Sequence, residues 1–251
     1  HFSGGITPAI SLFLTGVTLA FLMDSRQKKG DPPVSRVRAA IRRAGYLLLV
    51  AFLFRLQLWA FGYPSSPAHD LLKVDILNSM AFGIATMAAM AVLTTSQRVH
   101  AGILTGSLIA AFSPVVSLLS GPNVPAIIRM YVVPDYNYFS YFPWAAFIAF
   151  GVSSGSILRL VKADQMHRVM QWAAILGFGL IISGQYFSNL PYSIYPAVDF
   201  WLNSPGLIFI KVGVILVLAL DLLERRRAAA EAIQSPPPAL RGVQERTGSS
   251  R

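Results

Sequence analysis

The sequence predicts an all-α, polytopic membrane protein, a helical bundle of seven transmembrane helices with its N-terminus outside and its C-terminus in the cytoplasm. Three observations support this fold class. Seven apolar stretches of about 17–21 residues can each cross a hydrocarbon core of roughly 30 Å as a helix. Lys and Arg residues concentrate in alternate loops between these stretches, and Trp and Tyr residues gather at the opposite ends.

The apolar stretches alternate with loops of unequal charge. In chain order, the stretches are residues 6–23, 44–61, 75–95, 101–119, 141–161, 170–188 and 206–223. The loop after the first carries seven basic residues, opposed only by Asp24 and Asp31, and a proline pair within it ends any helix. The second stretch leads to a loop with one lysine, Lys73, and the third returns to a tight turn at Arg98 and His100. We therefore expect the first and third loops in the cytoplasm.

The last four stretches continue this alternation. The loop at 120–139 has Arg129 as its only basic residue, and the loop at 189–205 has no Lys or Arg. Between these two loops, the fifth stretch ends in a basic turn, and the seventh leads to three arginines at 225–227. Because Lys and Arg mark cytoplasmic loops, the long loops at 120–139 and 189–205 are expected outside.

Composition agrees with a membrane protein. Hydrophobic residues make up 54% of the chain and charged residues 13%, more apolar than a soluble domain of 251 residues requires. A net charge of +10 would suggest nucleic-acid binding in a soluble protein. Here the cytoplasmic loops account for the charge, so the expected partner is the lipid bilayer and no nucleic acid. We expect a transmembrane domain at 1–224 and a disordered basic cytoplasmic tail at 225–251.

Two pairs of glycines lie four residues apart within apolar stretches, Gly102 with Gly106 and Gly151 with Gly155. Small residues at this spacing permit close contact between membrane helices. We expect helix contacts at both pairs, although glycine is common in such helices and the signal is weak.

Ionisable residues inside apolar stretches are costly and usually functional. Arg55 and Lys211 each lie roughly 8–9 Å below the expected outer surface, at 1.5 Å per helical residue. Asp75 opens the third stretch at the same level. Two cations and an acid at one depth on different helices predict a shared polar cavity that faces outward. The alternative is that Arg55 and Lys211 extend to the outer headgroups with their aliphatic stems in lipid.

Further polar residues belong to the same level of the bundle. Asn78 follows Asp75 by one helical turn, and Asp199 and Gln185 lie at similar depth, so these residues complete the candidate substrate site. Asp75 could equally cap the N-terminus of its helix, since Asp accepts hydrogen bonds from free N–H groups there. Capping and substrate contact are compatible roles.

The expected outer side contains few candidates for a general base. His69, beside Asp70 in an outer loop, and His1 are the outer histidines, and a carboxylate is the other choice. His69 can equally be an ordinary loop residue. The chain contains no Cys, and it lacks a P-loop, a dinucleotide fingerprint, an HExxH motif and a serine-hydrolase elbow. We therefore expect no metal cofactor.

Four segments together carry a family resemblance. They are ITPAISLFLTGVTLAF (6–21), LLKVDILNSMAFGIA (71–85), FSYFPWAAFIAFGVSSG (139–155) and DFWLNSPGLIFIKVGVILVLAL (199–220). In this order and spacing they resemble the bacterial membrane proteins related to the heparan-α-glucosaminide N-acetyltransferase catalytic domain, transmembrane acyltransferases. The resemblance covers roughly residues 6–224.

This resemblance implies a transferase of the bacterial cytoplasmic (inner) membrane. Family members move an acyl group, mainly acetyl, from cytoplasmic acetyl-CoA or another acyl-CoA to an amine or hydroxyl of a sugar or glycan on the outer face. Asp75 and Asn78 match the polar pair that the family has at the start of this helix, and we assign them to positioning the acceptor or holding the base. Arg55 and Lys211 would bind an anionic sugar or stabilise negative charge. A homodimer is compatible with this interpretation.

The resemblance also implies a catalytic His near the outer end of a first helix, after an Asp/Arg-Gly signature. The sequence begins at His1 beside a membrane segment, and His1 does not match the family position. We therefore expect an N-terminally incomplete chain whose base either lies in the missing helix or is not identifiable in this sequence. Two other functions stay open: a transporter or flippase of a polar or glycan substrate, and a non-catalytic membrane subunit. No internal repeat or pair of broken helices favours the transporter.

Overall fold

The computed structural model describes residues 2–65, 67–121, 124–190, 194–196 and 198–234. The long helices are α1 (Phe2–Lys28), α2 (Pro33–Gly62), α4 (Thr95–Ser117), α6 (Tyr141–Leu160), α7 (Met166–Ser188) and α8 (Pro205–Gln234). The shorter ones are α3 (Ile76–Met87), α5 (Ala126–Val132) and the 3₁₀ turns η1 (Ala68–Leu72), η2 (Ala88–Val92), η3 (Leu118–Ser120) and η4 (Ala163–Gln165). The described chain is all-helical, and six of its helices are long and apolar enough to cross a membrane. These helices indicate an integral membrane protein.

The predicted third stretch becomes a composite element. α3 is followed directly by η2, and together they form one apolar run, Ile76–Val92, that is shorter than the six long helices. Since a 3₁₀ turn rises about 2.0 Å per residue against 1.5 Å in an α-helix, the composite is about 28 Å long. That length is close to a hydrocarbon core, and a seventh transmembrane span stays a prediction.

Local signals account for the helix starts. α2 begins with Pro33, whose fixed φ suits the first turn, after Gly30 with a φ of 81°. α4 begins with a capping box: Thr94 Oγ1 accepts from the N–H of Gln97 at 3.3 Å, and Gln97 Oε1 accepts from the N–H of Thr94 at 3.0 Å. α8 begins at Pro205.

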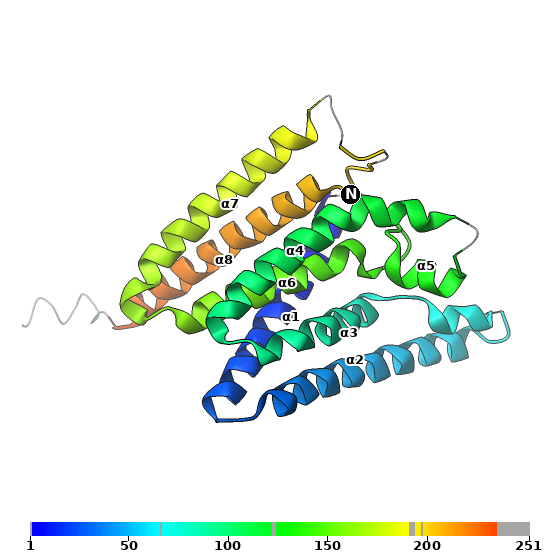
Figure 1. Cartoon of the computed structure of the whole chain (residues 1–251), viewed down its shortest axis with the longest axis horizontal. Coiled ribbons are helices and arrows are strands. Elements are labelled where there is room, and N and C mark those ends of the chain that lie inside the picture. Colours follow the sequence, from blue (N-terminus) through cyan, green and yellow to red (C-terminus); the bar gives the residue numbers. More distant parts are fainter. Residues whose placement is uncertain (1, 66, 122–123, 191–193, 197, 235–251) are drawn as a thin grey trace, which may run out of the picture.

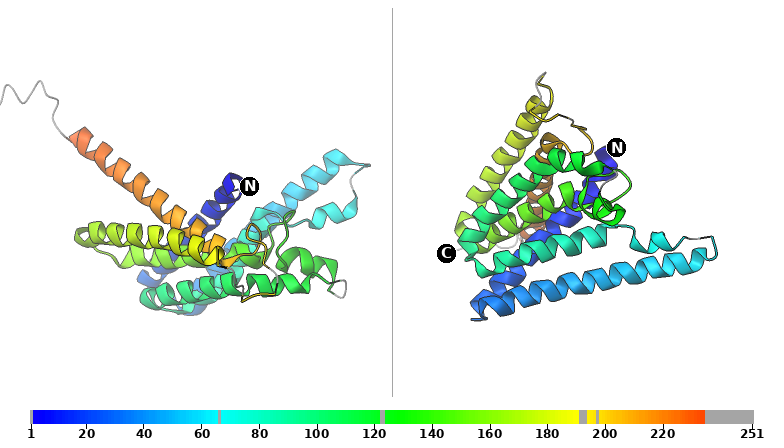
Figure 2. Two further views of the ribbon diagram at one scale, coloured as in Figure 1. Left: turned by 90° about the horizontal axis from the view of Figure 1, so that it is seen from above. Right: turned by 45° about the vertical axis from the view of Figure 1, so that its right-hand side comes forward.

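The central helix of the bundle is α6 (Figure 1). It packs between α1 and α4 and also contacts α3, α5 and α8. Of the residues in its membrane-spanning segment, 67% are buried, against 11% in α2 and 17% in α7, which flank the bundle. Figure 2 shows α2 beside α3 on one flank and the C-terminal part of α8 projecting beyond the bundle.

Glycines permit these close contacts, as the sequence predicts. A Cβ added at Gly151 would lie 2.1 Å from the carbonyl oxygen of Phe13 in α1, and one at Gly102 would lie 2.7 Å from that of Ala149 in α6. Gly106 and Gly155 face α6 and α1 in the same way. Membrane helices approach this closely only where side chains are minimal.

The helix ends gather at two opposite ends of the bundle. Hydrogen bonds join Asp24 near the end of α1 to Thr95 at the start of α4 and to Arg159 near the end of α6, and we call this the arginine end. At the other end, Asn203 before α8 bonds to Ser117 at the end of α4. Successive helices therefore run in alternating directions, while their orientation to the cytoplasm stays a prediction.

Two expectations about loops need correction. The loop at 120–139 contains the short helix α5 (Figure 1). α8 continues to Gln234, so residues 225–234 are helical where we expected disorder, because this part is rich in Ala, Glu and Arg, all strong helix formers. An ion pair of 2.8 Å between Asp221 and Arg225 adds support. Residues 235–251 lie outside the described part.

Candidate functional site

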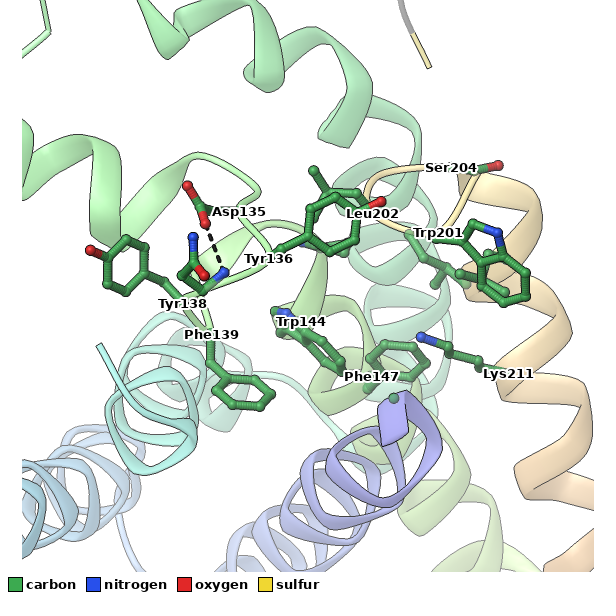
Figure 3. Close-up of a pocket in the computed structure, with 15 residues that line it drawn as sticks. Asp135, Tyr136, Tyr138, Phe139, Trp144, Phe147, Trp201, Leu202, Ser204 and Lys211 are labelled. Atoms are coloured by element: carbon green, nitrogen blue, oxygen red, sulfur yellow. Dashed lines mark hydrogen bonds between the residues drawn. The ribbon is translucent and has the colours of Figure 1, made fainter. Parts of the chain in front are cut away.

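A cavity of about 520 Å³ lies at the end of the bundle opposite the arginine end, and we call this the cavity end. It is enclosed by the segment before α6, the first turns of α6 and α8, and Gly5 of α1 (Figure 3). Its aromatic lining residues are Tyr136, Tyr138, Phe139, Trp144, Phe147 and Trp201. Its charged lining residues are Asp135 and Lys211. This volume falls within the range of about 300–1,000 Å³ that is typical of small-molecule sites.

The start of α6 positions the largest of these rings. Ser140 precedes the helix, and its hydroxyl donates to the carbonyl oxygen of Phe142 at 2.7 Å. Trp144 in the first turn then packs its indole against Phe139 and Phe147, with ring centroids 5.1 and 6.0 Å away. These contacts fix the indole as one wall of the cavity (Figure 3).

The turn before α8 is organised by Asp199. One carboxylate oxygen, Oδ1, accepts from the N–H of Trp201 at 2.9 Å, and the backbone carbonyl oxygen accepts from the N–H of Asn203 at 3.0 Å and of Ser204 at 3.2 Å. In return, the side chain of Asn203 accepts from the N–H of Asp199 at 2.9 Å. The turn thereby places Trp201 and Ser204 on the cavity.

The other carboxylate oxygen of Asp199 joins two loops beside the cavity. Tyr136 donates its hydroxyl hydrogen to Asp199 Oδ2 at 2.6 Å. This hydrogen bond is the largest of the causes that raise the pKa of Tyr136 to about 12. Asp199, which we expected in the substrate site, thus positions a cavity residue and is not itself part of the lining.

Lys211 reaches the cavity from the second turn of α8. Only 7% of the residue is exposed, and its Nζ lies 5.3 Å from the centre of the Trp144 ring. No carboxylate of the described residues lies within 4 Å of it. A cation–π contact contributes about 0.5–2 kcal/mol. The Trp144 ring therefore stabilises the ammonium group without neutralising its charge.

Arg55 and Asp75 lie elsewhere and bind each other. Arg55 Nη2 of α2 donates to Asp75 Oδ1 at the start of α3, and neither residue lines the cavity. The shared cavity that we expected for Arg55, Asp75 and Lys211 is therefore not formed. The physical reason is that the charges of Arg55 and Asp75 are taken out of water in the bundle and are stabilised there by forming an ion pair with each other.

The sequence allowed Asp75 to cap the N-terminus of α3, and the structure confirms its position there but not a capping hydrogen bond. Asp75 occupies the N-cap position of α3, yet its side chain makes no capping hydrogen bond because it pairs with Arg55. Asn78 is buried and donates to the carbonyl oxygen of Lys73 at 3.3 Å. The predicted polar pair thus anchors the start of a helix.

The other predicted site residues lie away from the cavity or outside the description. Gln185 is exposed on α7 and does not line the cavity. His69 belongs to η1, but its side chain is not among those described, and His1 lies outside the described residues. Within the described chain, no three His, Cys, Asp or Glu side chains are grouped as metal ligands would be.

Sequence reasoning missed Asp135 and the cavity role of the aromatic residues. Trp144, Trp201, Tyr136 and Tyr138 are among the Trp and Tyr residues that gather at the predicted outer ends of the apolar stretches, where such residues favour the membrane interface. They also line the cavity. The signal in the sequence was that these rings cluster in two short segments, 136–144 around the start of α6 and 195–201 before α8. Tryptophan and tyrosine residues that merely face the membrane interface do not need to cluster in this way.

A second missed cluster forms the arginine end. The carboxylate of Asp24 is buried and accepts from Arg159 Nε at 2.7 Å and Thr95 Oγ1 at 2.9 Å. Arg98 is fully buried and donates to Thr95 and Gln27. The sequence placed Asp24 in the first cytoplasmic loop and Arg98 in a tight cytoplasmic turn, without indicating that they are buried. The cluster joins α1, α4 and α6.

Comparison of the chain with protein-family models, with curated proteins and with solved structures returned no match. The family resemblance of the four segments therefore stays a prediction.

Proposed function

We propose that this protein is an integral membrane acyltransferase of the bacterial cytoplasmic membrane. It transfers an acyl group, most simply acetyl, from cytoplasmic acyl-CoA to an amine or hydroxyl of a sugar held in the cavity. The observation that carries the proposal is the cavity of about 520 Å³ with aromatic walls at the end of the bundle where the charge pattern predicts the outside. Aromatic faces pack against the C–H faces of a sugar ring, and polar groups between them bind its hydroxyls.

The cavity residues suit acceptor binding. Asp135 Oδ1 accepts from the N–H of Asn137 at 2.7 Å, which holds the carboxylate in its turn and leaves the second oxygen for a ligand hydroxyl or amine. Ser204 and Tyr136 add hydroxyl groups to the lining. The family resemblance assigns the general base to a His of a preceding helix, so the residues of this cavity would bind and orient the acceptor.

The arginine end suits the acyl donor. Lys28, Lys29, Arg38 and Arg42 are exposed in and after the loop between α1 and α2. A concentration of positive charge raises the local concentration of a polyanion such as the phosphates of CoA. Donor and acceptor would then approach from opposite ends of the same bundle, as transfer across a membrane requires.

The test is acyl transfer in inside-out vesicles that contain the protein expressed from its native gene. Radiolabelled acetyl-CoA is supplied outside and glucosamine is enclosed inside. We expect label on the enclosed sugar. Replacing Trp144 with Leu should lower the rate at least about tenfold, because it removes a stacking wall.

The matched control is Trp172→Leu, on the exposed face of α7, which should leave the rate unchanged. Absence of label with several acyl donors and sugar acceptors would contradict the proposal. In that case transport of a polar or glycan substrate would become the preferred function. Equal losses in both tryptophan variants would exclude the cavity as the acceptor site.

A further inference from the structure

The ammonium group of Lys211 is a buried charge without a counter-ion among the residues that the structure describes. It is held 5.3 Å from the centre of the Trp144 ring, and no described carboxylate lies within 4 Å. Other buried or half-buried cations of the described chain have polar partners: Arg55 has Asp75, and Arg159 has Asp24. Arg98, which has no described carboxylate within 4 Å, donates to Thr95 and Gln27. A buried charge is normally paired, so the missing partner of Lys211 points to something that enters the cavity.

The surroundings of Lys211 keep its ammonium group on the cavity. A Cβ added at Gly5 of α1 would lie 2.9 Å from Nζ, so a glycine at this position leaves the space that the group occupies. The residue is only 7% exposed and lines the cavity, whereas a lysine that reaches for lipid headgroups would be exposed at its tip. Figure 3 shows the side chain directed toward the cavity, beside Trp144 and Phe147.

The charges of the lining are separated. Asp135 lies across the cavity from Lys211, with the Tyr136 and Trp144 rings between them (Figure 3). Asp135 and Lys211 are therefore too far apart to form an ion pair with each other. A ligand complementary to this arrangement has an acidic group at one end, a flat body between the rings, and hydroxyl or amino groups at the other end.

We infer that Lys211 binds a carboxylate or phosphate group of the ligand, so that the cavity selects an acidic sugar over a neutral one. This inference rests on the proposed acceptor site and adds its substrate class. Carboxylate and phosphate share the chemistry that an ammonium group recognises, a compact anion with oxygen acceptors. The phosphate of an outer-leaflet lipid could also supply that anion, and the test separates the two sources.

The test is equilibrium binding to the whole chain in nanodiscs of phosphatidylcholine, followed by tryptophan fluorescence, without acyl-CoA. The probes are glucuronate, glucose 6-phosphate, glucose and glucosamine. We expect one of the two acidic sugars to bind at least about tenfold more tightly than glucose. Lys211→Met should abolish this preference, Lys211→Arg should retain part of it, and Arg129→Met, a cation outside the cavity, should leave it intact.

Thermal unfolding provides a second measurement, because the direction of the change in Tm distinguishes a binding role of Lys211 from a structural one. Since Lys211→Met removes a buried charge without a counter-ion, the variant should keep or raise the Tm in the absence of ligand. A lysine with a structural role would instead show a lower Tm. The acidic sugar that binds should raise the Tm of the unmodified protein and not that of Lys211→Met.

Three results would overturn the inference. The first is equal binding of acidic and neutral sugars, which would leave the proposed acyl transfer intact. The second is an acid preference that survives in Lys211→Met. The third is an acid preference that is present in a phosphate-free detergent and is abolished by adding phosphatidylcholine or phosphatidylglycerol, because both lipids carry the phosphate that would then occupy Lys211. Binding of no sugar at all would contradict the acceptor site itself, and with it the proposed function.

Discussion

Arg55 and Lys211 are both cations within apolar helices, yet among the described residues only Arg55 has a carboxylate beside it. The paired residue contributes to the packing of α2 against α3, and replacing one member would leave the other charge buried and alone. The unpaired residue, Lys211, presents a positive charge to the cavity. At the scale of single residues, a buried cation that binds polar side chains, as Arg55 binds Asp75 and Arg98 binds Thr95, is a structural charge. Lys211 has no such partner among the described residues and lines a cavity, so it is a candidate binding group.

The hydrogen bond between Tyr136 and Asp199 makes a prediction about pH. The pKa of Tyr136 is raised from its ordinary 10.0 to about 12, chiefly because its hydroxyl donates to the Asp199 carboxylate. A group with a raised folded pKa contributes stability that is complete below its unfolded pKa. That stability is lost as the pH rises through the folded value. The contribution should therefore be complete below about pH 10 and disappear between pH 10 and about 12.

The measurement is the Tm of the unmodified protein and of Tyr136→Phe from pH 8 to 12. The difference between the two proteins should shrink across the window from pH 10 to about 12. Tyr186→Phe, exposed on α7, is the matched control and should follow the unmodified protein at every pH. A difference between Tyr136→Phe and the unmodified protein that is constant with pH would show that the bond contributes nothing.

At the scale of elements, α6 determines the geometry of the cavity. Its glycine and alanine surfaces draw α1 and α4 close, and its first turn carries Trp144 to the cavity. At its other end, Arg159 binds the buried Asp24 of α1. Both ends of α6 are therefore fixed by neighbouring helices, which keeps the cavity wall rigid.

Close packing of α6 predicts a large effect for a single added methyl group. Gly151→Ala would place a Cβ 2.1 Å from the carbonyl oxygen of Phe13, so α1 and α6 must separate. We expect the variant to lose about 1–3 kcal/mol of stability, measured as a lower Tm in detergent. Gly179→Ala on α7 is the matched control, because no atom lies within 4 Å of the added Cβ.

The control should be neutral or more stable by up to about 1 kcal/mol, since alanine is the better helix former. Equal Tm values for the two variants would contradict the contact between α1 and α6. Weaker sugar binding in Gly151→Ala would further connect this contact to the cavity.

At the scale of the whole molecule, the bundle has two chemically different ends. The arginine end is held by buried polar groups around Asp24 and Arg98, and exposed lysines and arginines surround it. The cavity end is aromatic and contains a single buried ammonium group, Lys211, in its lining. This polarity fits a protein that faces different partners on the two sides of a membrane.

The predicted orientation can be tested with single cysteines, because the chain contains no Cys. Asn137→Cys, exposed before α6, should react with a membrane-impermeant maleimide in intact cells. Lys29→Cys, exposed after α1, should react only after the membrane is permeabilised. The reverse pattern would invert the orientation and place the cavity on the cytoplasmic side.

The apolar stretches could be assigned from sequence because length and composition suffice to recognise them. Six of the seven predicted spans correspond to long apolar helices, and the glycine pairs at 102–106 and 151–155 lie at helix contacts. The third span was harder, because the change from α3 to a 3₁₀ turn at Ala88 has no marker in an alanine-rich run. The residues at 225–234 were assigned to a tail although their helix propensity is high.

The candidate site depended on information that a single sequence does not contain. Depth along each helix could be counted, so the sequence singled out Arg55, Asp75 and Lys211 as ionisable residues within or at the ends of apolar stretches. Which of them face each other depends on the rotation of each helix about its axis and on its neighbours. Hydropathy determined that the chain forms apolar helices, because unpaired backbone N–H and C=O groups are costly in lipid however the helices are arranged relative to one another. Only tertiary packing decided that Arg55 meets Asp75 and that Lys211 faces an aromatic cavity without a counter-ion in the described part of the chain.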